Sequence, residues 1–381
     1  MLIHSPPQTD LGVEWPMKNL SSHFPLQNSQ IISNPKQELH HHVNDDEARC
    51  DWEFTLSAVI SSPAGNSDAI GVAEFDDGGA FLATGGIARK IRIYATETSL
   101  RSGACDFYIC ASAKLSSLKW RPGSGSRVIG SGDYDGVVME YDLERRVPVS
   151  ERDEHGGRRV WAIDYSRWGP TLGASASDDG TVQLWDPRSC DRSVAAVRPD
   201  RSARSPVCCV EFSPFGGPLV VAGCADRRVY GYDVRRAAEP VFVMERHEKA
   251  VTYTKFMDAR TIVSSSVDGS LVMWDAEDGR VIRTYRGHVN TKRFVGLSVW
   301  RNGGLLSCGS ENNRVYVYDR RWAGPVWVRG LETGPRTGCE PGFVSSVCWR
   351  QTGEERCMLV VGASDGMLQL FEGERKSGDD S

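Results

Sequence analysis

The chain has 381 residues, of which 40% are hydrophobic and 25% are charged, and its formal net charge is −5. This composition is ordinary for a globular protein, and the acidic balance argues against nucleic acid as the main partner. The sequence contains neither an apolar run of about 18 residues, which a membrane helix needs, nor the basic start of a secretory signal.

Residues 1–50 are rich in Pro, Gln, Asn, Ser and His and show no sustained hydrophobic period. We therefore expect a disordered N-terminal arm. The run His40-His41-His42 beside Asp45 and Asp46 carries metal-ligand side chains. In a disordered segment such a run is more often a solvated polar tract, so neither a metal nor a cofactor is predicted.

From Ile70 onward one pattern recurs: an alternating strand, a small-residue strand, a turn, and a strand that closes on an aromatic residue. The closing residues are Tyr94, Tyr141, Trp185, Tyr232, Trp274, Tyr318 and Phe371. Their successive spacings are 47, 44, 47, 42, 44 and 53 residues. Units of about 40–45 residues with four short strands are typical of WD-type propeller blades. The sequence thus predicts an all-β, seven-bladed WD40 β-propeller.

The two ends of the repeat region predict how the ring closes. Ten residues follow Phe371, too few for a loop and a packed fourth strand, whereas 52–61 has the pattern of a spare strand. We expect 52–61 to supply the outer strand of the last blade, which leaves no open sheet at the join. The propeller would then span 51–373, and 374–381 would form a flexible tail.

A turn position lies six residues before each closing aromatic. It is occupied by Ala88, Asp135, Asp179, Asp226, Asp268, Asn312 and Asp365. In WD-repeat proteins an upstream His bonds the turn Asp and, through a strand hydroxyl, the Trp. Two blades carry this structural set, His155, Asp179 and Trp185 in the third and His247, Asp268 and Trp274 in the fifth. Because the set repeats, we interpret it as structural rather than catalytic.

Enzymatic motifs are missing from the sequence. It has no G-x-x-x-x-G-K-[ST] phosphate loop, no H-E-x-x-H and no G-x-S-x-G. We therefore predict that the protein is not an enzyme and binds other proteins. A generic scaffold and a propeller enzyme with acid–base groups at the axis stay open as alternatives.

The loops on one face of the predicted ring interleave aromatic and cationic residues. These are Lys114, Tyr134, Arg159, Trp161, Lys249, Lys292 and Phe294. Aromatic rings supply rigid contact area and cations pair with acids, so this rim suits a peptide with an apolar anchor and acidic flanks. The alternative is that Trp161 and Phe294 are core residues of the first strands.

Several segments closely resemble plant photomorphogenesis repressors. They are ATGGIARKIRIY (83–94), KLSSLKW (114–120), GDYDG (132–136), HEKAVTYTKF (247–256), YRGHVNTKRFVGL (285–297) and FVSSVCW (343–349). The similarity covers roughly 52–372. It is to the propeller of the constitutive photomorphogenic ubiquitin ligase and of the suppressors of phytochrome A. Since the 50-residue arm has neither RING-type zinc spacing nor heptads, the chain most resembles the short repressor of UV-B photomorphogenesis family.

That resemblance implies a non-enzymatic negative regulator in the nucleus and cytoplasm, which binds the plant UV-B photoreceptor and returns it to its inactive dimer. It leaves the constitutive photomorphogenic ubiquitin ligase open as a further partner. It also implies a groove for Val-Pro peptides of the photoreceptor and of transcription factors. The basic residues of the ligase groove fall on Lys114, Arg159 and Lys249, and its aromatic residues on Tyr134, Trp161 and Phe294. An acidic groove residue falls at Thr291, a departure that should change which flanking charges are tolerated.

A further resemblance lies at three blade ends. The segments are Trp185-Asp186-Pro187-Arg188, Tyr232-Asp233-Val234-Arg235 and Tyr318-Asp319-Arg320-Arg321. They resemble the box with which WD proteins dock on the damaged-DNA-binding adaptor of cullin-based ubiquitin ligases. This implies a second possible role, a ligase substrate receptor for photomorphogenesis transcription factors. The alternative is an Asp–Arg pair within each blade.

Overall fold

The structure, a computed structural model, describes residues 50–61, 68–169, 171–189, 193–331 and 342–376. The chain divides into two units, Met1–Ala48 and Arg49–Ser381, and every described element belongs to the second. The expected arm (but for Cys50) and its His run lie outside the described residues, as does the end of the expected tail.

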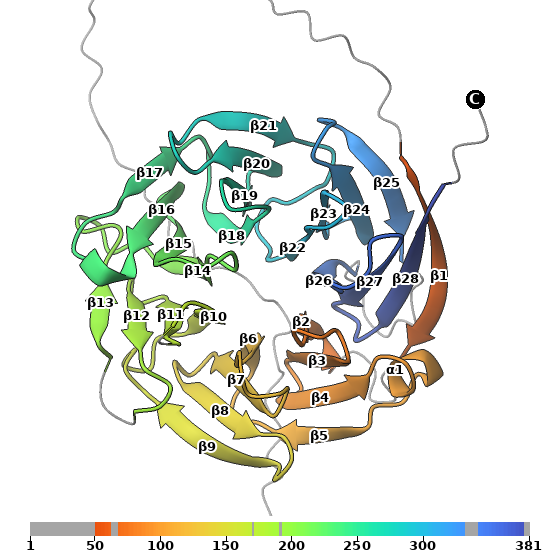
Figure 1. Cartoon of the computed structure of the whole chain (residues 1–381), viewed down its shortest axis with the longest axis horizontal. Coiled ribbons are helices and arrows are strands. Elements are labelled where there is room, and N and C mark those ends of the chain that lie inside the picture. Colours follow the sequence, from red (N-terminus) through yellow and green to blue (C-terminus); the bar gives the residue numbers. More distant parts are fainter. Residues whose placement is uncertain (1–49, 62–67, 170, 190–192, 332–341, 377–381) are drawn as a thin grey trace, which may run out of the picture. The chain divides into compact units, whose positions relative to one another are not determined.

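Within the described residues, the strands form seven antiparallel four-stranded sheets arranged in a ring (Figure 1). Blade one consists of β2 (Ile70–Phe75), β3 (Phe81–Gly86), β4 (Lys90–Ala95) and β5 (Phe107–Cys110). Blade two consists of β6 (Leu115–Trp120), β7 (Val128–Asp133), β8 (Val138–Asp142) and β9 (Val147–Arg152). Blade three consists of β10 (Val160–Tyr165), β11 (Gly173–Ser177), β12 (Val182–Trp185) and β13 (Ala195–Val197).

The other blades repeat this order, with the first strand innermost. Blade four consists of β14 (Val207–Phe212), β15 (Leu219–Cys224), β16 (Arg228–Asp233) and β17 (Phe242–Glu245). Blade five consists of β18 (Val251–Phe256), β19 (Thr261–Ser266), β20 (Ser270–Asp275) and β21 (Val281–Tyr285). Blade six consists of β22 (Leu297–Trp300), β23 (Leu305–Cys308), β24 (Arg314–Asp319) and β25 (Pro325–Gly330). The predicted seven-bladed propeller is confirmed.

Blade seven joins the two ends of the ring. It consists of β26 (Val344–Trp349), β27 (Arg356–Ala363), β28 (Leu368–Arg375) and β1 (Trp52–Ile60). β1 pairs with β28 from Trp52↔Arg375 to Ile60↔Leu368, and the two strands lie side by side in Figure 1. Because this pairing continues to Arg375, the last strand runs two residues beyond the expected end of the propeller at 373.

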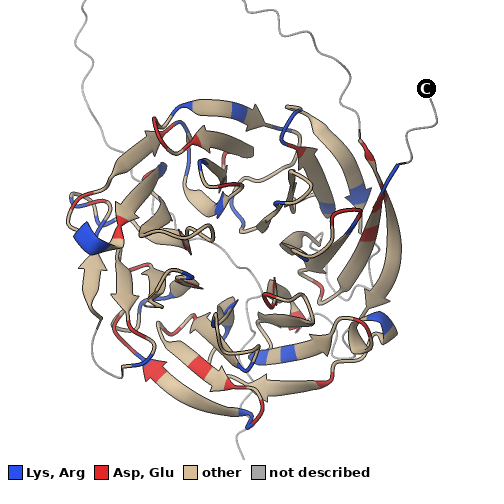
Figure 2. Cartoon of the chain, in the orientation of Figure 1, with Lys and Arg blue, Asp and Glu red and all other residues tan. Residues whose placement is uncertain are grey.

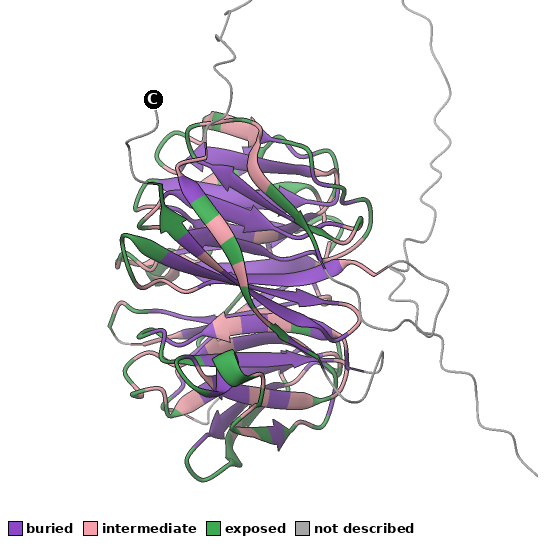
Figure 3. Cartoon of the chain, turned by 90° about the vertical axis from the view of Figure 1, so that its right-hand side faces the viewer, coloured by how far each residue is buried: buried purple, intermediate pink, exposed green. Residues whose placement is uncertain are grey.

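Apolar side chains fill the layers between neighbouring blades, and exposed residues lie on the outer edges (Figure 3). Side chains of the same blade or of the next one explain the small residues of the second strands; a Cβ on Gly132, for example, would lie 2.6 Å from Val160 of blade three. A Cβ on Gly173 would lie 2.2 Å from the ring of Trp185, so this position has no room for a larger residue. Short helical turns in the described part of the chain include α1 (Ser99–Ser102) and a 3₁₀ turn (Val234–Arg236).

Candidate functional site

One backbone contact, repeated in several blades, builds the rim that the sequence predicts. In each case a backbone N–H in the turn between the second and third strands donates to the carbonyl of a residue at the start of the first strand. Tyr134 N–H donates to the Lys114 carbonyl and Asp178 N–H to the Arg159 carbonyl, both at 3.0 Å. This contact brings residues from two separate loops of a blade to the same face.

Four aromatic rings from different blades meet on this face. The rings of Trp161 and Phe294 are stacked, with centroids 4.5 Å apart and an interplanar angle of 16°. Tyr134 packs edge-on against Trp161 at 6.0 Å, and Tyr253 packs edge-on against Phe294 at 5.6 Å. Trp161 is 8% exposed, so these rings bury most of it. We call Tyr134, Trp161, Tyr253 and Phe294 the rim aromatics.

Arg159 and Asp178 hold the orientation of Trp161. The Arg159 guanidinium lies over the rings of Tyr134 and Trp161, 4.4 and 4.6 Å from their centroids. The Trp161 Nε1–H donates to the Asp178 carboxylate at 2.5 Å. Burial raises the pKa of the Tyr134 hydroxyl although Arg159 opposes this. Asp178 is not among the residues predicted for the rim, and its only signal in the sequence is the doubled Asp at 178–179.

Thr291 lies in a loop that Glu311 organises. The Glu311 carboxylate accepts hydrogen bonds from the N–H groups of Thr291, Lys292 and Arg293 at 2.9, 2.9 and 3.0 Å. It also accepts one from the Thr291 hydroxyl at 2.7 Å. Burial opposes the charged form, but these hydrogen bonds hold the pKa of Glu311 below its usual range. A carboxylate therefore does lie beside position 291, with its oxygens already engaged, and sequence reasoning missed it.

The remaining cations of the rim are exposed. Lys114, Lys249 and Lys292 are exposed, and Arg159 is partly buried. Figure 2 shows that charges of both signs are distributed around the whole ring. The rim therefore combines an apolar centre with exposed lysines, an arrangement suited to an acidic peptide with an apolar anchor.

The predicted structural sets differ between the two blades. In blade five, His247 lies 3.1 Å from Asp268 and 2.7 Å from Ser264, whose hydroxyl accepts the Trp274 Nε1–H at 2.8 Å. The set is therefore continuous there.

In blade three, His155 lies 2.9 Å from Asp179 and 2.8 Å from Ser175, but the Trp185 Nε1 has no hydrogen-bond partner among the described residues. The expectation that Trp185 joins its set is therefore wrong. Trp185 is held by packing instead, with Tyr165 at 5.4 Å and the Arg152 guanidinium at 5.0 Å from its ring.

The three blade-end motifs all form Asp–Arg pairs within their own blade. Arg188 donates to both carboxylate oxygens of Asp186 at 3.0 and 2.7 Å, which lowers the pKa of Asp186 to about 2. Arg235 pairs with Asp233 in the same way, at 2.9 and 2.5 Å. Both arginine side chains are 62% exposed. Arg321 differs, because it also bonds Asp51 just before β1.

The described residues contain no group of three His, Cys, Asp or Glu side chains placed to hold a metal ion. Within the same residues, no helix is long and apolar enough to cross a membrane.

The chain is similar to known WD-repeat β-propeller proteins. The β-propeller family model described as nucleolar protein 10-like, N-terminal domain, matches residues 81–333. The WD repeat-containing protein RUP2 of Arabidopsis thaliana is 59% identical over 328 residues, which cover 81% of this chain and 89% of RUP2. RUP1 of the same plant is 58% identical over 334 residues, 86% of each chain. The E3 ubiquitin-protein ligase COP1 of Arabidopsis thaliana is 34% identical over 78% of this chain, but over only 44% of the ligase.

Proposed function

We propose that this chain, which belongs to the β-propeller family of the WD repeat-containing proteins RUP1 and RUP2, is a non-enzymatic adaptor that represses UV-B signalling. Its partner is the plant UV-B photoreceptor, whose C-terminal Val-Pro tail lies on the rim. The bound photoreceptor then returns to its inactive homodimer. The nucleus and the cytoplasm are the compartments where this adaptor acts.

The observation that carries the proposal is the packing of the rim aromatics. Val and Pro side chains are compact and rigid, so they lose little conformational entropy when they pack on aromatic faces. Phe294 and Tyr134, both partly buried, present an apolar surface of this kind, and the buried Trp161 packs beneath them from the first strand of blade three. Such a surface suits a short apolar anchor rather than a long side chain.

The charges around the rim set the preference for acidic flanks. Among the described residues, neither Lys114 nor Lys249 has a carboxylate partner, whereas Glu311 and Asp178 are engaged by hydrogen bonds within the protein. The ammonium groups of these lysines, and that of the exposed Lys292, are therefore available to a ligand. Exposed cations of this type raise the association rate and select the partner more than they raise affinity.

Return of the photoreceptor to a dimer requires no chemistry by this chain. A binding protein shifts an equilibrium when it binds one state more tightly than the other. The adaptor must therefore contact the photoreceptor core as well as the tail, and must favour the state that leads to the dimer.

The decisive experiment mixes the purified chain with UV-B-activated photoreceptor and follows the return of the dimer by size-exclusion chromatography. We expect the return to be faster than in buffer, and slower again when Lys114, Tyr134 and Trp161 are all replaced by Ala. A return rate equal to that in buffer would contradict the proposal.

A second function is favoured by one specific observation. The guanidinium groups of Arg188 and Arg235 are each 62% exposed although each is paired with an Asp of its own blade. A guanidinium has five N–H donors, so such a pair retains donors for a partner. These arginines support docking on the damaged-DNA-binding adaptor of a cullin-based ligase, with transcription factors as substrates.

A further inference from the structure

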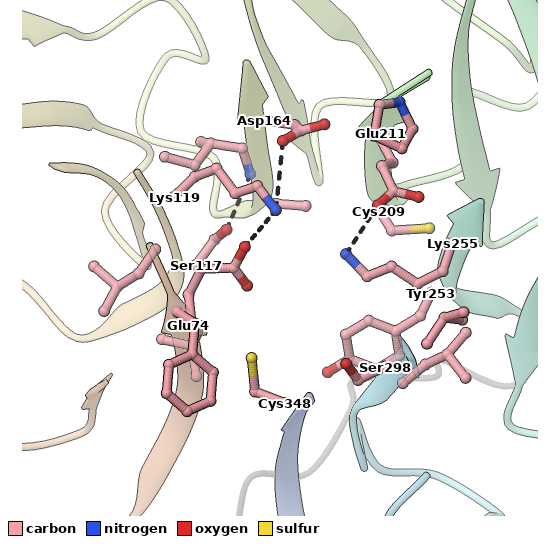
Figure 4. Close-up of a pocket in the computed structure, with 18 of the residues that line it drawn as sticks. Glu74, Ser117, Lys119, Asp164, Cys209, Glu211, Tyr253, Lys255, Ser298 and Cys348 are labelled. Atoms are coloured by element: carbon pink, nitrogen blue, oxygen red, sulfur yellow. Dashed lines mark hydrogen bonds and ion pairs between the residues drawn. The ribbon is translucent and has the colours of Figure 1, made fainter. Parts of the chain in front are cut away.

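The first strands of the blades enclose a cavity of about 400 Å³ around the axis of the ring (Figure 4). This size is within the range of small-molecule pockets, about 300–1,000 Å³. Trp161 and Tyr253 line the cavity at the end nearest to Phe294, which contacts both rings. Pro122, Phe215, Asn302 and Gln351 line it elsewhere, in the loops that follow first strands.

The wall formed by blades one to three has an excess of negative charge. Lys119 Nζ lies 2.5 Å from the Glu74 carboxylate and 3.6 Å from the Asp164 carboxylate. One ammonium therefore forms ion pairs with two carboxylates. Burial disfavours the charged form of Lys119, but Glu74 and Asp164 outweigh it and raise the pKa of the ammonium. Burial raises the pKa of the Asp164 carboxyl, whereas Lys119 and the Phe212 N–H at 2.7 Å stabilise its anion.

The opposite wall, from blades four to six, has an excess of positive charge. The Glu211 carboxylate lies 3.4 Å from Lys255 Nζ and 3.6 Å from Arg301 Nη2. It also accepts the Phe256 N–H at 2.7 Å. One carboxylate therefore forms ion pairs with two cations. In Figure 4 the Glu74–Lys119–Asp164 cluster and the Glu211–Lys255 pair lie on opposite sides of an open space.

This division of charge is the unusual feature of the cavity. The charges of Glu74, Lys119 and Asp164 sum to −1, and those of Glu211, Lys255 and Arg301 sum to +1. Asp76 and the Asp77–Arg167 pair also line the wall of blades one to three, which stays negative.

Burial opposes the charged form of Glu74, but Lys119 and, across the cavity, Lys255 lower the pKa of its carboxyl, so the two clusters already attract each other. A ligand with both charges brings an opposite charge closer to each cluster. The side chains of Glu74, Lys255 and Arg301 are 22%, 25% and 24% exposed, so a molecule in the cavity can reach all three.

We propose that the cavity binds a small zwitterion of amino-acid size. The cationic group of the ligand lies against Glu74 and Asp164, and its anionic group lies against Lys255 and Arg301. A molecule with a single charge compensates only one wall, and a neutral molecule compensates neither. Trp161 and Tyr253 belong to both the rim and the cavity lining, but the two charged clusters contain no rim residue, so binding of the ligand does not depend on the proposed function.

The test uses the purified full chain and isothermal titration calorimetry. The probes are straight-chain amino acids with increasing distance between the charges, namely glycine, 4-aminobutyrate and 6-aminohexanoate. Butyrate and butylamine are the matched probes with one charge each. We expect at least one zwitterion to bind about tenfold more tightly than both single-charge probes, because it meets both walls. Equal affinity for all five probes, or no heat from any of them at 10 mM (a concentration about ten times a millimolar Kd), would overturn the proposal.

Two variants assign the binding to the walls. Glu74→Gln and Lys255→Gln each remove the excess charge of one wall while keeping most of the side-chain size. Each should weaken the best zwitterion about tenfold and leave the binding of the single-charge probe for the other wall within about twofold. Glu374→Gln is the control, because Glu374 is 64% exposed and lies on β28 away from the cavity. If both cavity variants keep the far-ultraviolet circular dichroism of the wild type and also its zwitterion affinity, the assignment is wrong.

Discussion

The indole of Trp161 in blade three and the phenyl ring of Phe294 in blade six are stacked, with centroids 4.5 Å apart and an interplanar angle of 16°. The two blades are not neighbours in the ring. This contact therefore joins opposite parts of the rim and creates one apolar surface from two distant segments.

The stack predicts where peptide affinity is concentrated. Trp161→Ala or Phe294→Ala should weaken binding of a Val-Pro tail peptide by about 2 kcal/mol, or roughly thirtyfold, as for buried aromatic residues at interface centres. Fluorescence anisotropy with a labelled peptide measures the change. Phe215→Ala is the control, since Phe215 is 47% exposed and belongs to the loop after the first strand of blade four. Its variant should bind as the wild type does.

The two structural sets predict unequal costs for the same substitution. Trp185 and Trp274 are both 1% exposed, but only Trp274 donates its Nε1–H to a partner, Ser264. Trp274→Phe should therefore lower the free energy of unfolding by about 1 kcal/mol more than Trp185→Phe, the typical contribution of one hydrogen bond. Denaturant unfolding monitored by circular dichroism compares the two variants. Equal losses would show that the hydrogen bond to Ser264 adds nothing to stability.

His288 predicts a specific loss of stability in mild acid. Burial lowers its pKa from about 6.5 to about 4. Between these values the unfolded chain binds a proton that the folded chain does not bind, so stability falls as the pH falls. Above pH 6.5 the neutral His288 takes nothing from the free energy of unfolding. Near pH 4 the loss of unfolding free energy should approach about 3 kcal/mol.

Denaturant unfolding at pH 7, 5.5 and 4.5 measures this dependence, and His288→Gln supplies a side chain that does not titrate. The variant should be less stable at pH 7, because His288 Nδ1 lies 3.0 Å from the Tyr318 hydroxyl. Its stability should nevertheless change less with pH than that of the wild type. The same slope in both proteins would assign the acid sensitivity to other groups.

The exposed arginines predict which blade ends dock on a ligase adaptor. Arg188→Ala and Arg235→Ala should each reduce recovery of the cullin-ligase adaptor in a pull-down by about threefold or more, since each removes a bidentate donor. Arg321→Ala should leave recovery unchanged, because Arg321 is engaged by Asp319 and Asp51. Unchanged recovery with Arg188→Ala would leave these motifs a purely structural role.

Much of the rim could be predicted from the sequence because repeats carry positional information. Once the blades are aligned, Lys114, Arg159 and Lys249 fall just before first strands, and Tyr134 falls in a turn of the same face. The resemblance to the ligase propeller also identified the departure at Thr291. The sequence did not show that a carboxylate lies beside Thr291, because Glu311 comes from a turn 20 residues later in the chain.

The sequence by itself determined the seven blades, their strand order and the segment that pairs with the last strand, because strand periodicity and repeat length are local properties of the chain. Only the tertiary structure decided that Trp161 meets Phe294, that Asp178 orients Trp161, and that Trp185 has no hydrogen-bond partner. It also divided the charges of the cavity between two walls. The physical reason is that these contacts join residues from different strands or blades. Their geometry depends on how the sheets pack and how the ring closes, which no local pattern in the sequence records.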